Sequence, residues 1–312
     1  MKIYLLPRLM IATCFLLLSM QVFAVSEKYK PYFLADMGGS SVNAIIDDIK
    51  TRLREAGFKV VGEYRPYPKA TVISFTNNTL KRIARKEPNA LYMTALRISV
   101  TDISPTIQVS YSNPTYFAYA YRVKASVESV TEKLIQIFGK QEDFGSKRGL
   151  KKRKLKHYHY SFGMEYFDEP LELNKFDNQR KAIDTIETGF LESRGDTRKI
   201  YRIDIPGKNM TVYGVSITAG EGSDKNLSAN INCYTYKHNA HFPYEISVIN
   251  GVVQALHPRF RIALAFPDTR MAGRCSFMSI MNAPVSINSS LTQLAGGVIN
   301  NNDDGFGGDA DY

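Results

Sequence analysis

The segment from Tyr244 to Arg261 holds the side chains of this sequence that are best suited to chemistry. Tyr244 and Glu245 precede a predicted hairpin, and His257, Arg259 and Arg261 follow it in HPRFRIALAFP. Arginine binds carboxylate and phosphate groups through paired hydrogen bonds, and histidine exchanges a proton near neutral pH. We therefore predict a binding site for a small anionic ligand at these five residues.

The conformation of HPRFRIALAF decides whether these side chains meet. As a strand, it places His257, Arg259 and Arg261 on one face. Ideal register across the preceding Asn-Gly turn then sets Tyr244 opposite His257. Pro258 instead suits the first turn of a helix, in which Arg259 and Arg261 point about 200° apart. In that case the arginines lie at the edge of a core and His257 caps or turns the chain, and the sequence leaves both conformations open.

A second group of possible ligands lies in CYTYKHNAHFPYE. Cys233, His238, His241 and Glu245 are of types that bind zinc or copper, but their spacing matches no closed metal site. The sequence also lacks a Ser nucleophile elbow, a Walker loop, a Rossmann glycine pattern, HExxH and CxxC. We therefore expect no metal and no cofactor, and the sequence gives an enzyme little support.

The N-terminus has the pattern of a secretory signal peptide. Lys2 and Arg8 stand before an apolar run over 9–20, and Val-Phe-Ala ending at Ala24 is typical of a cleavage site. The run is shorter than the roughly 20 residues that a membrane-spanning helix needs. We expect a periplasmic or secreted protein that is cleaved near Ala24.

Export would place Cys233 and Cys275 in an oxidising compartment, where disulfides persist. A bond between them would close a loop of about 43 residues and stabilise the fold by about 4 kcal/mol. The alternative is a pair of unrelated buried thiols.

Basic residues outnumber acidic ones, with 40 Lys and Arg against 30 Asp and Glu and a pI near 9.3. Seven of the basic residues lie in SKRGLKKRKLK. Such an excess permits weak contact with an anionic membrane surface. We expect no nucleic acid partner, because an exported protein seldom meets one.

The pattern along the chain predicts an α+β fold with two similar compact domains, each a sheet with packed helices. The predicted parts are a signal peptide (1–24), a first domain (25–145), a basic linker (146–160), a second domain (161–298) and a disordered acidic tail (299–312). Strands are expected at FKVVGEY and TVISF around the breaker RPYPK, and a hairpin at Asn250-Gly251.

The two predicted domains share an order of elements. ALRISVTD and PYEISVIN each contain an ISV strand, followed by a turn, a second strand, an X-Pro step and an aromatic segment. This order suggests an internal duplication with diverged copies. NPTYFAYAYR should form a helix capped by Asn113 with Pro114 in its first turn.

The first half also resembles the domain-of-unknown-function family 302. The similarity rests on AIIDDIKTRLREAGFKVVGEY, TALRISVTD and VSYSNPTYF over Tyr32 to Gly139, and more weakly on Lys175 to Gly296. The resemblance implies a compact sheet with helices packed on it. It implies no catalytic residues.

Tyrosines gather around the NPTYFAYAYR segment, at Tyr111, Tyr116, Tyr119 and Tyr121. They could line a ligand pocket, although aromatic residues at this spacing more often pack in a core.

The sequence favours an exported binding or accessory protein whose partner is a small anionic ligand or an envelope protein. One alternative is a hydrolase-like enzyme with His257 or His241 as general base and Arg259 or Arg261 holding an anionic substrate. The other is a structural envelope or assembly protein.

Overall fold

A computed structural model describes residues 27–39, 41–161 and 163–299 of the chain. It confirms the predicted α+β class. The predicted signal peptide and all of the predicted tail except Ile299 lie outside the described residues. Across the described ranges, no helix has the length and apolar character to cross a membrane.

The elements follow one another along the chain in two runs. The first run is β1 (Lys28–Tyr29), β2 (Tyr32–Leu34), α1 (Val42–Glu55), β3 (Lys59–Tyr67), β4 (Ala70–Thr76), α2 (Asn78–Lys86), η1 (Pro88–Met93), β5 (Leu96–Asp102), β6 (Ile107–Ser112), α3 (Pro114–Ala120), α4 (Glu128–Phe138), β7 (Glu142–Phe144), β8 (Leu150–Lys151) and α5 (Lys152–Lys156). The second run is β9 (Leu171–Lys175), α6 (Gln179–Leu191), η2 (Arg194–Asp196), β10 (Thr197–Asp204), β11 (Met210–Ile217), α7 (Asp224–Ile231), η3 (Asn239–His241), β12 (Tyr244–Ile249), β13 (Val252–Ala255), α8 (Pro258–Ala265), η4 (Phe277–Ile280) and α9 (Ala283–Leu294).

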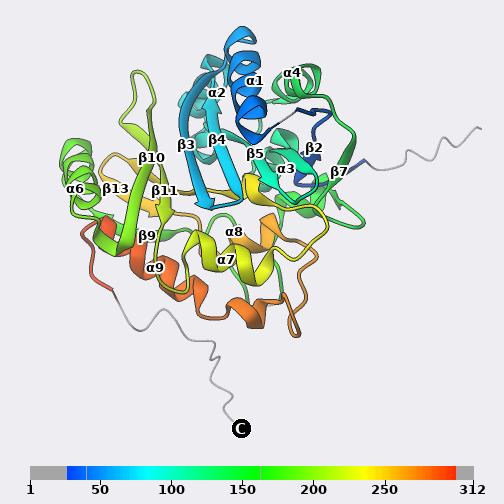
Figure 1. Cartoon of the computed structure of the whole chain (residues 1–312). Coiled ribbons are helices and arrows are strands. Elements are labelled where there is room, and N and C mark those ends of the chain that lie inside the picture. Colours follow the sequence, from blue (N-terminus) through cyan, green and yellow to red (C-terminus); the bar gives the residue numbers. More distant parts are fainter. Residues whose placement is uncertain (1–26, 40, 162, 300–312) are drawn as a thin grey trace, which may run out of the picture.

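Two antiparallel sheets form the body of the molecule (Figure 1). The six-stranded sheet has the order β3-β4-β5-β6-β2-β7, and the five-stranded sheet has the order β10-β11-β12-β13-β9. Strands β1 and β8 form a separate small pair. The order 3-4-5-6-2 in the first sheet thus matches 10-11-12-13-9 in the second, and helices follow the corresponding strands. This match agrees with the expected duplication, which stays a prediction.

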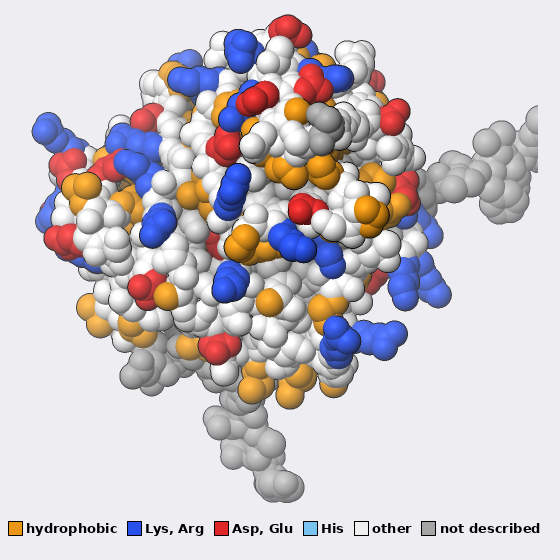
Figure 2. Space-filling model, viewed as in Figure 1, with side chains coloured by type: hydrophobic (Ala, Val, Ile, Leu, Met, Phe, Trp, Pro, Cys, Tyr) orange, Lys and Arg blue, Asp and Glu red, His pale blue; other side chains and the backbone are white. Residues whose placement is uncertain are grey.

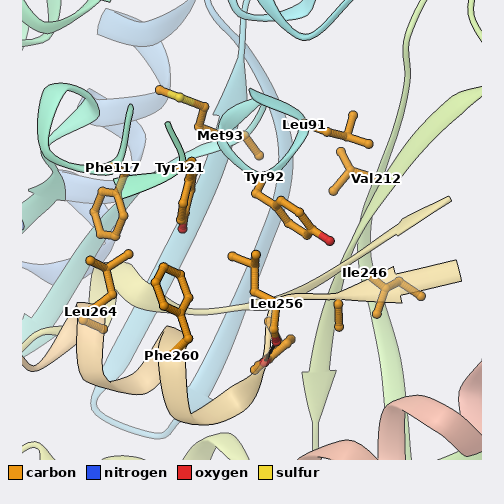
Figure 3. Packing of buried hydrophobic residues seen from close by; sticks show 14 of the residues in the cluster. Leu91, Tyr92, Met93, Phe117, Tyr121, Val212, Ile246, Leu256, Phe260 and Leu264 are labelled. Carbon is orange, nitrogen blue, oxygen red and sulfur yellow. Dashed lines mark hydrogen bonds between the residues drawn. The ribbon is translucent and has the colours of Figure 1, made fainter. Parts of the chain in front are cut away.

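The two halves share one hydrophobic core. Helices α1 and α4 cover one face of the first sheet and enclose a core of their own. A larger core joins residues of η1, α3, β11, β12 and α8. Figure 3 shows Phe260 and Leu264 of α8 facing Phe117 and Tyr121 of the first half, with Tyr92 directed toward the second sheet. Burial of this size between the halves stabilises them as a unit.

Local signals in the sequence explain several boundaries. The Asn113 side chain accepts from the backbone of Thr115 and caps α3, which begins at Pro114 as predicted. The hairpin turn has positive φ at both Asn250 (53°) and Gly251 (89°), as a type I′ turn requires.

Two expectations about loops differ from the structure. Only the end of RPYPK separates the two expected strands, because β3 continues to Tyr67 and Pro68 and Lys69 make the turn before β4. Pro66 is tolerated because β3 is an edge strand, and its pairing with β4 is irregular between Tyr64 and Tyr67. The segment 146–160, expected as a solvated linker, forms β8 and α5 and buries Leu155 in the shared core.

Gly62 brings an edge strand of each sheet into contact. A Cβ atom added at Gly62 of β3 would lie 2.6 Å from the carbonyl oxygen of Ile200 in β10. We expect Gly62→Ala to lower the free energy of unfolding by about 1–3 kcal/mol, since the two backbones must separate. Urea denaturation would measure this. Gly38→Ala, where an added Cβ meets nothing within 4 Å, is the control, and equal effects of the two changes would contradict the close approach.

Candidate functional site

The segment HPRFRIALAF is a helix after its first residue. Helix α8 begins at Pro258, and the His257 side chain accepts from the backbone of Arg259 as the N-cap, 3.2 Å away. The hairpin register is the ideal one, with Ile249 opposite Val252, but β13 ends at Ala255 before a partner for Tyr244 is reached. The strand strip of Tyr, His and two Arg side chains therefore does not form.

Arg261, Glu245 and Tyr244 do come together, inside the protein. The guanidinium of Arg261 lies 3.2 Å from the Glu245 carboxylate and 4.3 Å from the centre of the Tyr244 ring. It also donates to the carbonyl oxygens of His241 and Pro243. Arg261 and Glu245 are only 6% and 2% exposed, so this ion pair contacts almost no solvent.

The partner that sequence reasoning missed is Arg97. Its guanidinium pairs with the other oxygen of the Glu245 carboxylate, from β5 in the first half, and is only 6% exposed. Burial lowers the pKa of Arg97. One carboxylate thus faces two buried guanidiniums, and we call Arg97, Glu245 and Arg261 the ionic joint. The sequence contains one signal for it, because Arg97 and Glu245 each stand directly before the Ile-Ser-Val of the two similar segments.

His257 and Arg259 lie apart from this joint. Both contact Glu165, with His257 Nδ1 at 3.3 Å and Arg259 Nε at 3.1 Å from the carboxylate. All three side chains are largely buried. The five predicted residues are therefore divided between two ion-pair groups.

The cysteine and histidines that were considered as metal ligands make other contacts within the protein. Cys233 and Cys275 lie at disulfide distance, with Cα atoms 6.0 Å apart, in agreement with the predicted bond. Buried His238 contacts the carbonyl oxygen of Ala265, and buried His241 contacts that of His238. Within the described ranges, no group of three or more His, Cys, Asp and Glu residues is placed to hold a metal ion.

A groove with a cationic lining lies where the edges of the two sheets meet. Its volume is about 640 Å³, and Arg65 of β3, Arg198 of β10 and Lys225 of α7 contribute to its wall. Of the described residues, no Asp or Glu lines it, and none of these three cations pairs with a described carboxylate. Figure 2 shows Lys and Arg side chains spaced over this face. We call it the strand-edge groove.

Polar and aromatic side chains complete the strand-edge groove. Tyr64 and Tyr67 line it beside the hydroxyls of Ser216 and Thr218. Beneath them, the buried Asp224 carboxylate accepts from Tyr64 at 3.0 Å and from Ser216 at 2.8 Å. These bonds hold one wall from each half in place. The groove can therefore present three exposed cations and the aromatic rings of its wall to a ligand.

A second groove, of about 540 Å³, has mixed charge. Lys152 lies 4.7 Å from the ring centre of Tyr119, which Tyr29 meets edge-on. Lysines and carboxylates both line it, and Lys140 pairs with Asp143 at 3.0 Å. Of the four predicted pocket tyrosines, Tyr119 lines this groove, and the others are buried by packing: Tyr111, Tyr116 and Tyr121.

Comparisons of the chain with protein-family models, with curated proteins and with solved structures found no match. The resemblance to the domain-of-unknown-function family 302 therefore stays a prediction.

The ionic joint should dominate stability between the halves. We expect Glu245→Gln to lower the free energy of unfolding by about 3–5 kcal/mol, because two buried guanidiniums lose their counter-charge. Chemical denaturation at neutral pH measures the change. Glu63→Gln is the control, since Glu63 pairs with Lys50 on the surface, where an ion pair contributes about 1 kcal/mol at most. Similar losses in both variants would refute the role of the joint.

Buried histidines should make the protein sensitive to acid. Burial lowers the pKa of His238 to about 3 and holds the pKa of His241 well below its usual value. Only the unfolded chain then binds these protons just below pH 6.5, so stability present above pH 6.5 is lost as the pH falls toward 3. Each histidine contributes a slope of up to about 1.4 kcal/mol per pH unit.

Asp224 opposes this loss. Burial raises the pKa of its carboxyl to about 6, so the folded state gains stability as the pH falls from 6 toward the unfolded value near 3.8. Asp224→Asn should therefore steepen the acid loss, whereas His157→Gln on an exposed side chain should leave it unchanged. Denaturation between pH 7.5 and 4 tests both, and stability that rises on acidification would contradict the assignment.

Proposed function

We propose that this protein is an exported binding protein that holds a small anionic ligand in the strand-edge groove. The observation that carries the proposal is the meeting of Arg65, Arg198 and Lys225, from three elements and both halves, in a groove without a lining carboxylate among the described residues. Guanidinium groups bind carboxylates and phosphates in paired geometry. The ligand class is therefore a small molecule with one or more of these groups.

The dimensions and remaining walls support the same class. A volume of about 640 Å³ lies within the range of about 300–1,000 Å³ that ligand pockets occupy. Such pockets occur preferentially where two structural units meet. Tyr64 and Tyr67 offer ring surface for the apolar or planar part of the ligand.

Export is proposed on two observations. The first 24 residues have the charge, apolar run and small residues of a signal peptide. Cys233 and Cys275 lie at disulfide distance, as suits an oxidising compartment. The ligand would then be met outside the cytoplasm.

The hydrolase alternative has less support from the placement of its residues. His241 is 4% exposed and contacts the backbone of His238. His257 is the N-cap of α8 and lies against Glu165. Arg261 is held in the ionic joint, so it is not available to a substrate.

Binding can be measured by isothermal titration at low salt with pyrophosphate, citrate and glucuronate as probes. We expect at least one of them to bind the protein. The double variant Arg65→Gln/Arg198→Gln should weaken this binding by about tenfold or more, equivalent to about 1.4 kcal/mol, because two anion contacts are lost.

The control removes the same charge at another place. Arg85→Gln/Lys86→Gln lies on the exposed side of α2 and should keep the affinity of the unaltered protein. Equal weakening in both double variants would show attraction by net charge alone and overturn the proposal. Binding of none of the three probes would also overturn it.

A further inference from the structure

Four methionines surround one small cavity. Met164, Met271, Met278 and Met281 line it, and its volume is about 20 Å³. Seven methionines follow the predicted signal peptide, so more than half of them meet at this one place. We call this group the methionine cavity.

The backbone holds three of these side chains close together. The backbone N–H of Met278 donates to the carbonyl oxygen of Met271 at 3.1 Å, which places the two residues side by side. Met278 lies in the 3₁₀ helix η4 and Met281 is its C-cap. Side chains three residues apart in a 3₁₀ helix eclipse one another, so Met278 and Met281 project from the same side.

The loop that carries these residues is braced by its own contacts. Cys275 ties it to Cys233. Ser276 and Ser279 form a reciprocal capping box at the start of η4. Buried Met164 reaches the cavity from a separate segment. The cavity is thus formed by the fold without help from a ligand.

Exposure distinguishes these methionines from core residues. Met271, Met278 and Met281 are 43%, 56% and 48% exposed. Figure 2 shows hydrophobic side chains gathered along the lower edge of the molecule, where the loop before α9 lies in Figure 1. Exposed apolar surface that clusters in this way has a function more often than scattered exposed residues do.

We propose that the methionine cavity binds a soft monovalent metal ion, Cu(I) or its analogue Ag(I). Thioether sulfur is a soft ligand that selects Cu(I) over hard cations. A space of about 20 Å³ holds a single atom-sized guest, and its largely apolar wall lacks the two to four polar partners that a water needs. Thioethers also cannot pair into disulfides, so the site would persist where thiols are oxidised.

The one cationic side chain of the lining does not oppose this assignment. Arg259 borders the cavity, and its guanidinium pairs with the Glu165 carboxylate. This pair leaves little net charge beside a bound monovalent ion. Because Glu165 follows Met164 directly, the compensating carboxylate lies on the segment that supplies one ligand.

Silver titration of the full-length protein, purified without reductant, tests the proposal. Native mass spectrometry should detect one Ag(I) per chain. The variant Met271→Leu/Met278→Leu/Met281→Leu should bind Ag(I) about tenfold more weakly or worse, while the similar volume of leucine preserves the packing. Met37→Leu, outside the cavity, should bind as the unaltered protein does.

The pH dependence separates sulfur from nitrogen ligands. Thioethers carry no proton to displace, so Ag(I) affinity should not change between pH 8 and 5, whereas a histidine site would weaken. The proposal is overturned by an absence of Ag(I) binding, by unchanged binding in the triple variant, or by loss of binding at pH 5 under conditions in which circular dichroism shows that the chain is still folded. An unbound chain that self-associates through this face, with association lost in the triple variant, would instead identify an apolar docking surface.

Discussion

The ionic joint of Arg97, Glu245 and Arg261 is the interaction on which the arrangement of the two halves depends. Two guanidiniums share one carboxylate in the interior, and a buried charge is tolerated only when it is paired and hydrogen-bonded. Arg97 of β5 and Glu245 of β12 each stand directly before an Ile-Ser-Val sequence, so these two inner strands carry opposite charges at equivalent positions. A shift of one half relative to the other would separate Arg97 from Glu245 and leave a buried charge unpaired.

Other polar contacts follow from the same meeting of central strands. The Tyr92 hydroxyl lies 2.9 Å from the hydroxyl of Ser247, and Asn239 donates to Thr101 at 2.8 Å. Tyr116 donates to the carbonyl oxygen of Leu264 in α8. Each bond saturates a polar group that the shared core would otherwise bury alone. The specificity of the contact between halves comes from these groups, and its area comes from the apolar residues around them.

Short sequence patterns predict many of the helices, strands and turns. They do not indicate which residues of distant segments form ion pairs. The cap at Asn113 and the turn at Asn250 each depend on a few neighbouring residues, so the sequence contains them fully. Pro258 suits the first turn of a helix, as the structure shows, but no local pattern indicates that Arg261 and Arg97 pair with the same carboxylate of Glu245. The many charges of the basic segment 146–160 predict a solvated linker, but its Leu155 is buried in the shared core. The sequence does not predict the methionine cavity either, because Met164 is distant along the chain from the other three methionines.

The part of the predicted anion site around Arg261 is buried, so a ligand in solvent does not reach it. Arg261 has the right chemistry for an anion, yet Glu245 already occupies that role from within the chain. At the edges of the two sheets, the absence of a side chain at Gly62 permits β3 and β10 to approach each other closely. Arg65 and Arg198, on those same strands, consequently line one groove. A buried ion pair thus has a structural role in the interior, and the cations of the strand-edge groove remain exposed at the surface, where the proposed ligand would meet them.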